Sequence, residues 1–389
     1  MATTTTTTQI GGPIHSSRMV SRYRGTTLCP CTTTKSSIHA PLEARSLPRS
    51  ARIVRGRRTK KHAHHSLISH MAALSKRYRP PLEIRARRMT LSPQGLFQLT
   101  GPDAYRVEDA DEEVYLLQVR SGENTEGLGV VDSKHDTLRV TLRISSQTKR
   151  PCPEDIQVVL HQNCTALRSR AGDTGSVAWR CSTFFAEHML QQLWGTRPGP
   201  SLFHAQSFSA CRVLELGAGT GILPACLFTD PGWLHPSARP MRWIATDRAE
   251  NVPLLTKNVG GGRYDHAHAQ VSVRELGWLH VQAASDRMLN QLRTDILSSY
   301  EGAYPDLILC LDCVYNPALH RPLLSTLHAF CQPQHTVVLL VMQLRDVDNT
   351  LEFLTSWLSA SWTVYHVPES LLPPPMQTAY AAWVAWRTV

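Results

Sequence analysis

Val213-Leu-Glu-Leu-Gly-Ala-Gly-Thr-Gly221 is the stretch of the 389-residue sequence that decides the fold. Four largely apolar residues lead into three glycines spaced two apart, and a helical pattern begins at Ile222. The first four residues predict a buried strand. The glycines predict a tight turn in which a ligand contacts bare backbone, because glycine tolerates conformations that side chains exclude.

Strand and helix patterns alternate from this stretch to the C-terminus. Strands are predicted at 212–216, 242–246, 271–276, 307–311, 336–342 and 362–367, and helices between most of them at 222–228, 252–259, 284–298, 318–330 and 347–358. Such alternation indicates a parallel sheet covered on both faces. A last strand at 380–388 follows a short Pro-rich loop, so we expect it to run antiparallel. The prediction is an α/β fold with a doubly wound, seven-strand Rossmann-like sheet.

Residues 86–170 are predicted to form a small β-rich region ahead of this domain, which would span 171–389. Runs rich in Val, Leu and Ile occur at 113–120, 138–144 and 156–161, separated by Gly, Asp and Ser clusters. A helix is expected at 179–194, where large apolar residues recur at helical spacing before Gly195.

Residues 1–85 are predicted to be a disordered basic tail. The first 82 residues carry 15 Lys and Arg and one acid, Glu43, which leaves 26 Lys and Arg against 30 Asp and Glu in the remainder. The tail could bind RNA or act as a mitochondrial transit peptide. A mildly acidic body favours a basic protein partner over a phosphate backbone. His62, His64 and His65 lack further ligands nearby, so we expect no metal site.

Ten scattered cysteines favour a reducing compartment, and the lack of a long apolar segment indicates a protein that does not span a membrane. We expect the cytoplasm, with mitochondria as the alternative. We expect a monomer. Cys310 and Cys313 form a C-x-x-C pair inside an apolar run, where residues three apart on a strand point to opposite faces. Both are therefore predicted to be buried structural cysteines.

The spacing of the glycines separates two classes of cofactor. A dinucleotide fingerprint is G-x-G-x-x-G, whereas this turn is G-x-G-x-G with Glu215 two residues ahead of it. A carboxylate aimed at the pocket would repel a pyrophosphate and tolerate the amino-acid end of S-adenosylmethionine. We therefore expect S-adenosylmethionine as the cofactor and least of all a nicotinamide.

A carboxylate at the end of the second strand of the domain is the next expected cofactor contact. Asp247 ends this strand, where doubly wound sheets place an acid that binds ribose hydroxyls; the alternative is a helix cap. Trp278 follows the third strand and could lie against the adenine ring, and Trp179 opens the helix before the first strand. Core packing is the alternative for both tryptophans.

Asp312 and Tyr315 close the segment Asp306-Leu-Ile-Leu-Cys-Leu-Asp-Cys-Val-Tyr315, at the edge of the sheet where α/β enzymes carry their chemistry. This Asp-x-x-Tyr pattern resembles the family of class I, seven-strand protein-lysine methyltransferases that includes the valosin-containing-protein lysine methyltransferase. The similarity runs from about 174 to 330. It implies a cofactor site made of Trp179, Gly217, Ala218, Gly219, Asp247, Trp278 and Leu311.

Within that family the β-rich region and the segment 312–317 look most like the fungal ribosomal lysine methyltransferase 5 group. The resemblance implies monomethylation of a lysine in a large-subunit ribosomal protein. The chemistry itself requires a neutral amine aligned with the methyl group. Asp312 would attract the incoming ammonium, although a lone carboxylate raises the pKa of the lysine, and Tyr315 would form an apolar wall around the amine.

Alternative functions share the cofactor half of this site. An RNA or small-molecule methyltransferase would have the same glycine turn, but the acidic body and the missing Asn-Pro-Pro-aromatic segment argue against it. A non-catalytic ribosome-associated binder that uses the basic tail is the alternative from another class of function.

Overall fold

The computed structural model describes residues 90–388, apart from 101–102, 122–128, 145–150, 171, 198, 238 and 261–262. The described residues all belong to one compact unit, which lies within residues 66–389. The predicted basic tail, with His62, His64 and His65, lies outside the described residues. In the described part no helix is long and apolar enough to span a membrane.

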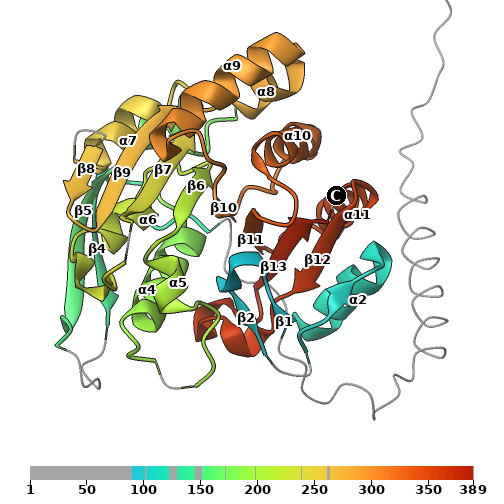
Figure 1. The fold of residues 1–389 in the computed structure, drawn as a ribbon, viewed down its shortest axis with the longest axis horizontal. Helices are drawn as coiled ribbons and strands as arrows, with labels where there is room; N and C mark the ends of the chain where they lie inside the picture. The colour runs from blue at the N-terminus through green and yellow to red at the C-terminus, as the bar shows by residue number, and fades with distance from the viewer. Residues whose placement is uncertain are drawn as a thin grey trace, which may run out of the picture. The chain divides into compact units, whose positions relative to one another are not determined.

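A nine-stranded mixed sheet forms the centre of the fold, in the order β3-β12-β13-β11-β10-β6-β7-β9-β8 (Figure 1). In this order the strands are Arg106–Val107, Trp362–His366, Tyr380–Arg387, Val337–Gln343, Leu307–Leu311, Arg212–Leu216, Met241–Asp247, Ala269–Glu275 and Arg263–His266. The five neighbouring strands from β11 to β9 run parallel. β13 is antiparallel to both β11 and β12, as predicted for the last strand. The short strands β3 and β8 extend the two edges, so the sheet has nine strands rather than the predicted seven.

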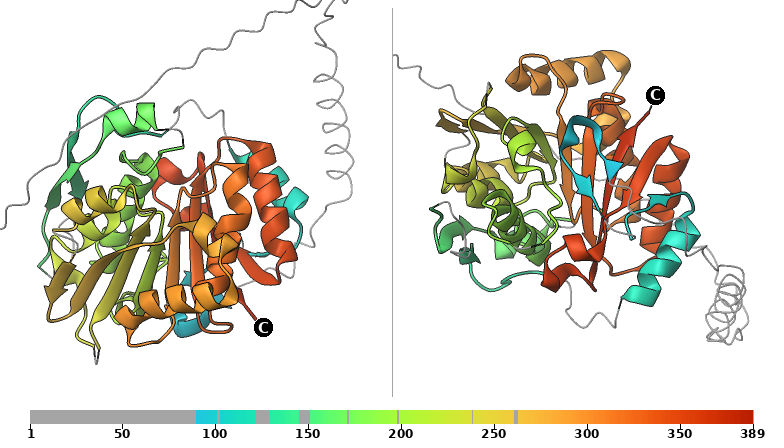
Figure 2. Two further views of the ribbon diagram at one scale, coloured as in Figure 1. Left: turned by 90° about the horizontal axis from the view of Figure 1, so that it is seen from above. Right: turned by 60° about the horizontal axis from the view of Figure 1, so that its bottom comes forward.

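Helices cover both faces of the sheet (Figure 2). One layer contains α4 (Arg180–Leu193), α5 (Ala205–Phe208), α6 (Ile222–Leu227) and α7 (Val252–Asn258), and the other contains α2 (Ala110–Arg120), α8 (Trp278–Ala283), α9 (Asp286–Leu297), α10 (His320–Phe330) and α11 (Val347–Ser359). Successive β10 residues alternate between the two cores, since Leu309 packs with the first layer and Ile308 with the second. This double burial explains why the strand is apolar at every position.

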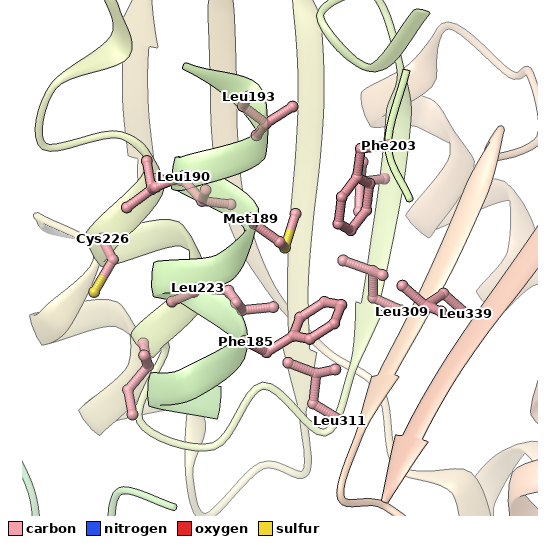
Figure 3. Packing of buried hydrophobic residues seen from close by; sticks show 14 of the residues in the cluster. Phe185, Met189, Leu190, Leu193, Phe203, Leu223, Cys226, Leu309, Leu311 and Leu339 are labelled. Atoms are coloured by element: carbon pink, nitrogen blue, oxygen red, sulfur yellow. The ribbon is translucent and has the colours of Figure 1, made fainter. Parts of the chain in front are cut away.

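The first layer packs directly on the sheet through α4. Phe185 and Met189 of this helix lie beside Leu309 and Leu339 in Figure 3, and all four side chains are fully buried. The hairpin of β4 (Thr137–Arg143) and β5 (Asp155–His161) adds its alternate apolar residues to the same core. The two predicted strands at 138–144 and 156–161 are therefore confirmed. The described part also contains the small strands β1 (Thr90–Leu91) and β2 (Gln98–Leu99) and the helix α3 (Cys164–Ser169).

The strand predicted at 113–120 is wrong, because this segment belongs to helix α2. Asp109 caps the helix by accepting a 2.9 Å hydrogen bond from the amide of Glu112, and acidic residues fill its first turn. Ala110, Val114 and Leu117 are buried at helical spacing. The pattern Asp109-x-x-Glu112 resembles a helix capping box, the signal that could have identified the helix.

The two C-x-x-C cysteines are buried, as predicted, but the prediction that they point to opposite faces is wrong. Cys310 and Cys313 belong to the same apolar cluster. The backbone turns between them at Asp312, whose φ is +57°, so the alternation of the strand ends before Cys313.

Glu113 fastens α2 to the sheet. Its buried carboxylate accepts hydrogen bonds from Tyr105 (2.6 Å), from the indole of Trp383 (2.8 Å) and from Nδ1 of His366 (2.8 Å). Burial raises the pKa of Glu113, but these hydrogen bonds and the charge of His366 outweigh burial and lower the pKa overall. The carboxylate is therefore ionised inside the fold and depends on its partners.

We expect Glu113→Ala to lower the free energy of unfolding by about 3 kcal/mol, because His366 and the other donors lose their buried acceptor. Urea unfolding followed by circular dichroism measures this loss. The control is Asp111→Ala, which removes an exposed carboxylate from the same helix turn and leaves the capping pattern intact. Equal stability of the two variants would contradict the role assigned to Glu113.

Candidate active site

A cavity of about 580 Å³ opens at the carboxyl ends of β6, β7, β9 and β10. In the sheet, β6 and β10 are neighbours from which the chain continues in opposite directions, so the cavity lies at the topological switch point where α/β sheets bind ligands. Nine of the ten predicted site residues line it: Trp179, Gly217, Ala218, Gly219, Asp247, Trp278, Leu311, Asp312 and Tyr315. Only Glu215 is absent from this lining.

The glycine turn after β6 requires glycine at all three positions. Gly217, Gly219 and Gly221 have φ values of +66°, +56° and +75°, which side chains disfavour. A Cβ on Gly217 would lie 3.1 Å from Sγ of Cys313 and 3.2 Å from the ring of Trp278. A Cβ on Gly221 would lie 2.6 Å from Leu255 of α7. The turn is therefore packed tightly on its protein side and presents backbone to the cavity.

Asp247 joins the end of β7 to this glycine turn. Its Oδ2 accepts a 2.7 Å hydrogen bond from the amide of Gly219, and its Oδ1 accepts from the amide of Arg248 (2.8 Å) and from Asn251 (2.9 Å). A carboxylate has about four acceptor positions, so these three bonds leave about one for a ligand hydroxyl. Burial raises the pKa of Asp247 overall, and its hydrogen-bond donors oppose the rise.

Glu215 was predicted to point at the cofactor pocket, but it does not line the cavity. Its buried carboxyl accepts a 2.9 Å hydrogen bond from the indole of Trp243, inside the core on the α4 side of the sheet. Burial raises the pKa of Glu215 to about 8, so the group is largely protonated at neutral pH. Glu215 precedes the turn on a strand whose side chains point into the two cores, whereas residues 217–220 of the turn line the cavity. Glu215 therefore does not repel a pyrophosphate from the cavity, contrary to the prediction.

The two predicted tryptophans border the cavity from different elements. Trp278 begins α8 and lies against Gly217. Trp179 precedes α4, and its indole donates a 2.7 Å hydrogen bond to the carbonyl of Thr174. Both side chains are partly exposed rather than part of a closed core, which favours a role in ligand contact.

The segment 172–175 also lines the cavity and contacts the glycine turn, and it was not among the predicted site residues. The hydroxyl of Thr174 donates a 2.9 Å hydrogen bond to the hydroxyl of Tyr315. Gly175 approaches so closely that a Cβ there would lie 2.1 Å from Asn251 and 3.4 Å from Asp247. This contact spans 76 residues of sequence, so no local pattern could have predicted it.

Asp312 lies at the end of β10 and is held by three donors. Arg345 forms a two-armed ion pair with it, with Nη1 to Oδ1 at 2.7 Å and Nη2 to Oδ2 at 2.5 Å. The amide of Gln343 donates to Oδ1 at 3.2 Å. Asp312 does not cap the following 3-10 turn at Pro317–Leu319, because Asn316 caps that turn. Asp312 is thus a fixed carboxylate at the cavity wall.

The geometry of the cavity fits S-adenosylmethionine. Its volume falls within the range of about 300–1,000 Å³ that is usual for ligand sites. The bare backbone at Gly217 and Gly219 provides close approach, Asp247 has acceptor capacity left for a sugar hydroxyl, and Trp278 offers a ring face. Asp312 and Tyr315 line the same cavity and provide polar groups where a methyl acceptor could enter.

Comparison with known proteins gives the same assignment for this region. A family model described as "Lysine methyltransferase" matches residues 161–359, which is more than half of the chain. The match begins at the end of β5, includes the whole cavity and ends with α11.

Three curated proteins are similar to this chain. One from Schizosaccharomyces pombe, named diaminohydroxyphosphoribosylamino-pyrimidine deaminase, is 25% identical over 65% of this chain and 52% of its own length. The Saccharomyces cerevisiae protein-lysine N-methyltransferase EFM6 is 27% identical over 41% of this chain and 61% of its own. The mouse methyltransferase-like protein 22 is 25% identical over 57% and 51%.

This chain therefore spans less than two thirds of the length of each of these relatives. The family assignment rests on the wider match of the family model and on the cavity that lies inside the matched region. Since that model matches more than half of the residues, the chain belongs to the lysine methyltransferase family.

Proposed function

We propose that this protein is an S-adenosylmethionine-dependent protein-lysine N-methyltransferase that uses Asp312 and Tyr315 at its methyl-acceptor site. One observation carries the proposal: the glycine turn, Asp247 and Asp312 line a single cavity at the switch point of the sheet. S-adenosylmethionine is the cofactor, and it supplies a methyl group bonded to a positively charged sulfur. The residues of the chain supply alignment and control of protons.

The cofactor half of the site is formed by the turn and by the ends of β7 and β9. Asp247 binds a ribose hydroxyl, and Trp278 lies against the adenine. Backbone groups of Gly217, Ala218 and Gly219 accommodate the amino-acid end. Trp179 and Leu311 complete the wall. This division explains why Asp247 is already oriented by Gly219 and Asn251, since a preoriented acceptor costs less ordering on binding.

The acceptor half must hold a lysine so that its nitrogen attacks in line with the carbon–sulfur bond. The lysine would first release one proton to solvent and react as a neutral amine. Its nitrogen would then take the methyl group from sulfur, which keeps the electron pair of the broken bond, and the positive charge would pass to the methylated nitrogen. Asp312 accepts a hydrogen bond from the amine. The Tyr315 hydroxyl accepts from Thr174, and burial raises the pKa of Tyr315, so it remains a protonated phenol that walls the site and is not a base.

The proposed acceptor is a lysine of a large-subunit ribosomal protein, methylated once in the cytoplasm. The ribosomal acceptor is proposed from the resemblance expected for segment 312–317. One observation supports a basic protein acceptor, since the chain outside its first 82 residues has more acidic than basic residues. A relative named protein-lysine N-methyltransferase adds support for a protein acceptor.

We expect Asp247→Ala to weaken S-adenosylmethionine binding about ten- to hundredfold, because it removes a charged hydrogen-bond acceptor from the ribose. Isothermal titration calorimetry measures the affinity. Asp286→Ala, an exposed carboxylate on α9, is the matched control and retains wild-type affinity. Unchanged affinity in Asp247→Ala would remove the assigned ribose contact.

Asp312→Asn separates chemistry from cofactor binding. We expect the rate of methyl transfer to fall at least about a hundredfold, because the amine loses the group that aligns it. The affinity for S-adenosylmethionine should stay near the wild-type value, since the cofactor contacts are elsewhere. Equal loss of cofactor affinity in this variant and in Asp247→Ala would contradict the division of the cavity.

The acceptor class is tested with radiolabelled S-adenosylmethionine and two fractions of a cell extract, purified large ribosomal subunits and ribosome-free protein. The proposal predicts monomethyl-lysine in one large-subunit protein, identified by mass spectrometry. Label confined to ribosome-free protein would show that the acceptor is not a ribosomal protein, while the proposed reaction, methylation of a protein lysine, would stand. Label in RNA or small molecules alone, or no transfer at all, would overturn the lysine assignment.

A further inference from the structure

Arg345 is a cavity residue that the sequence did not identify. It follows β11, lines the cavity, and its side chain is 22% exposed. The guanidinium carbon lies 5.6 Å from the centre of the Trp179 ring. Arg345 thus lies between the acceptor acid Asp312 and an aromatic wall of the cofactor cavity.

The ion pair with Arg345 fixes the direction of the Asp312 carboxylate. Both oxygens are bound by the planar guanidinium, and Oδ1 also accepts from the amide of Gln343. The backbone of Asp312 is fixed as well, because its amide donates a 2.7 Å hydrogen bond to Val341. Of about four acceptor positions, three are used, so Asp312 can take about one hydrogen bond from an incoming amine.

The ion pair also changes the charge that the acceptor meets. A bare carboxylate within about 4–6 Å raises the pKa of a lysine and holds it as unreactive ammonium. With Arg345 bound, the two charges largely cancel. A lone Asp312 would attract the lysine and also hinder its deprotonation. Cancelling its charge with Arg345 removes this hindrance.

Two cysteines and a tyrosine of the described residues face the pair. Cys181 of α4 lies beside both groups, and burial raises its pKa, so it stays a neutral thiol. Tyr380 of β13 faces Arg345. Cys313, also a thiol with a pKa raised by its hydrogen bond to Cys310 and by burial, lies next to Asp312. Arg345 is therefore the cation that balances Asp312 among the groups described around it.

We propose that Arg345 is a positioning residue for methyl transfer, which aims the Asp312 carboxylate and cancels its charge so that the acceptor lysine reacts as a neutral amine. This inference rests on the proposed function and deepens it. It assigns the control of lysine protonation to a residue outside the Asp-x-x-Tyr motif.

The test is the pH dependence of the single-turnover rate, with enzyme in excess over the acceptor, so that the rate reports the bound lysine. The acceptor is the cell-extract protein fraction that the wild-type enzyme labels, and methyl-lysine is measured after acid hydrolysis. We compare Arg345→Met, Arg345→Lys and, as a matched control, Arg287→Met on the exposed side of α9. S-adenosylmethionine affinity is measured for each variant.

Arg345→Met is expected to move the acid limb of the profile upward by about one to two pH units, because the uncovered carboxylate holds the lysine proton. At pH 7 its rate falls about ten- to hundredfold, and much of this loss is recovered at alkaline pH. Arg345→Lys keeps the charge and hence the wild-type limb, with a lower rate because the two-armed geometry is lost. Arg287→Met matches the wild-type protein.

If Arg345→Met alone does not fold, the double variant Asp312→Asn with Arg345→Met is used as well. It removes both charges and therefore leaves no unpaired ion in the site. Its acid limb is expected at the wild-type position, with a lower plateau. An equal rate loss for Arg345→Met at every pH, or a double variant whose limb stays shifted, would overturn the proposal. No methyl-lysine from the wild-type enzyme would instead overturn the proposed function, and this inference with it.

Discussion

The hydrogen bond from the Gly219 amide to the Asp247 carboxylate is the contact on which the rest of the site depends. It ties the turn after β6 to the end of β7 and exists only because Gly217, Gly219 and Gly221 can adopt positive φ values. The turn then bares backbone toward the cavity, while Asp247 keeps acceptor capacity for a ligand. The positions of Trp278, Leu311 and Asp312 follow, because the carboxyl ends of neighbouring parallel strands meet at one edge of the sheet.

Much of this arrangement could be predicted from the sequence, because the strands that form it are buried on both faces. Continuous apolar runs such as 307–311 and the glycine spacing are local signals, and the structure places β6 and β10 at the predicted residues. The reversed last strand could also be predicted from the short Pro-rich connection before it. The strand predicted at 113–120 is wrong because the apolar residues of this segment suit either period, and the signal for a helix, the cap at Asp109, lies outside it.

The contacts that could not be predicted are those between segments distant in sequence. Thr174 meets Tyr315 across 141 residues, and Arg345 meets Asp312 across 33. Glu215 shows the opposite failure, since a motif position suggested a ligand contact and the side chain instead bonds to Trp243 in the core. Strand alternation gives the face of a residue only after the sheet is known. The edge of the sheet that carries the site could therefore be predicted from the sequence. The pairing of Asp312 with Arg345 could be found only from the folded structure.

We propose that one cavity holds the methyl donor between Asp247 and Asp312. A crystal structure of the complex with S-adenosylhomocysteine would show this arrangement. We expect ribose hydroxyls on Asp247, the adenine beside Trp278, and the sulfur facing Asp312 and Tyr315. A ligand bound in another hollow of the protein, or one whose sulfur faces away from Asp312, would contradict it.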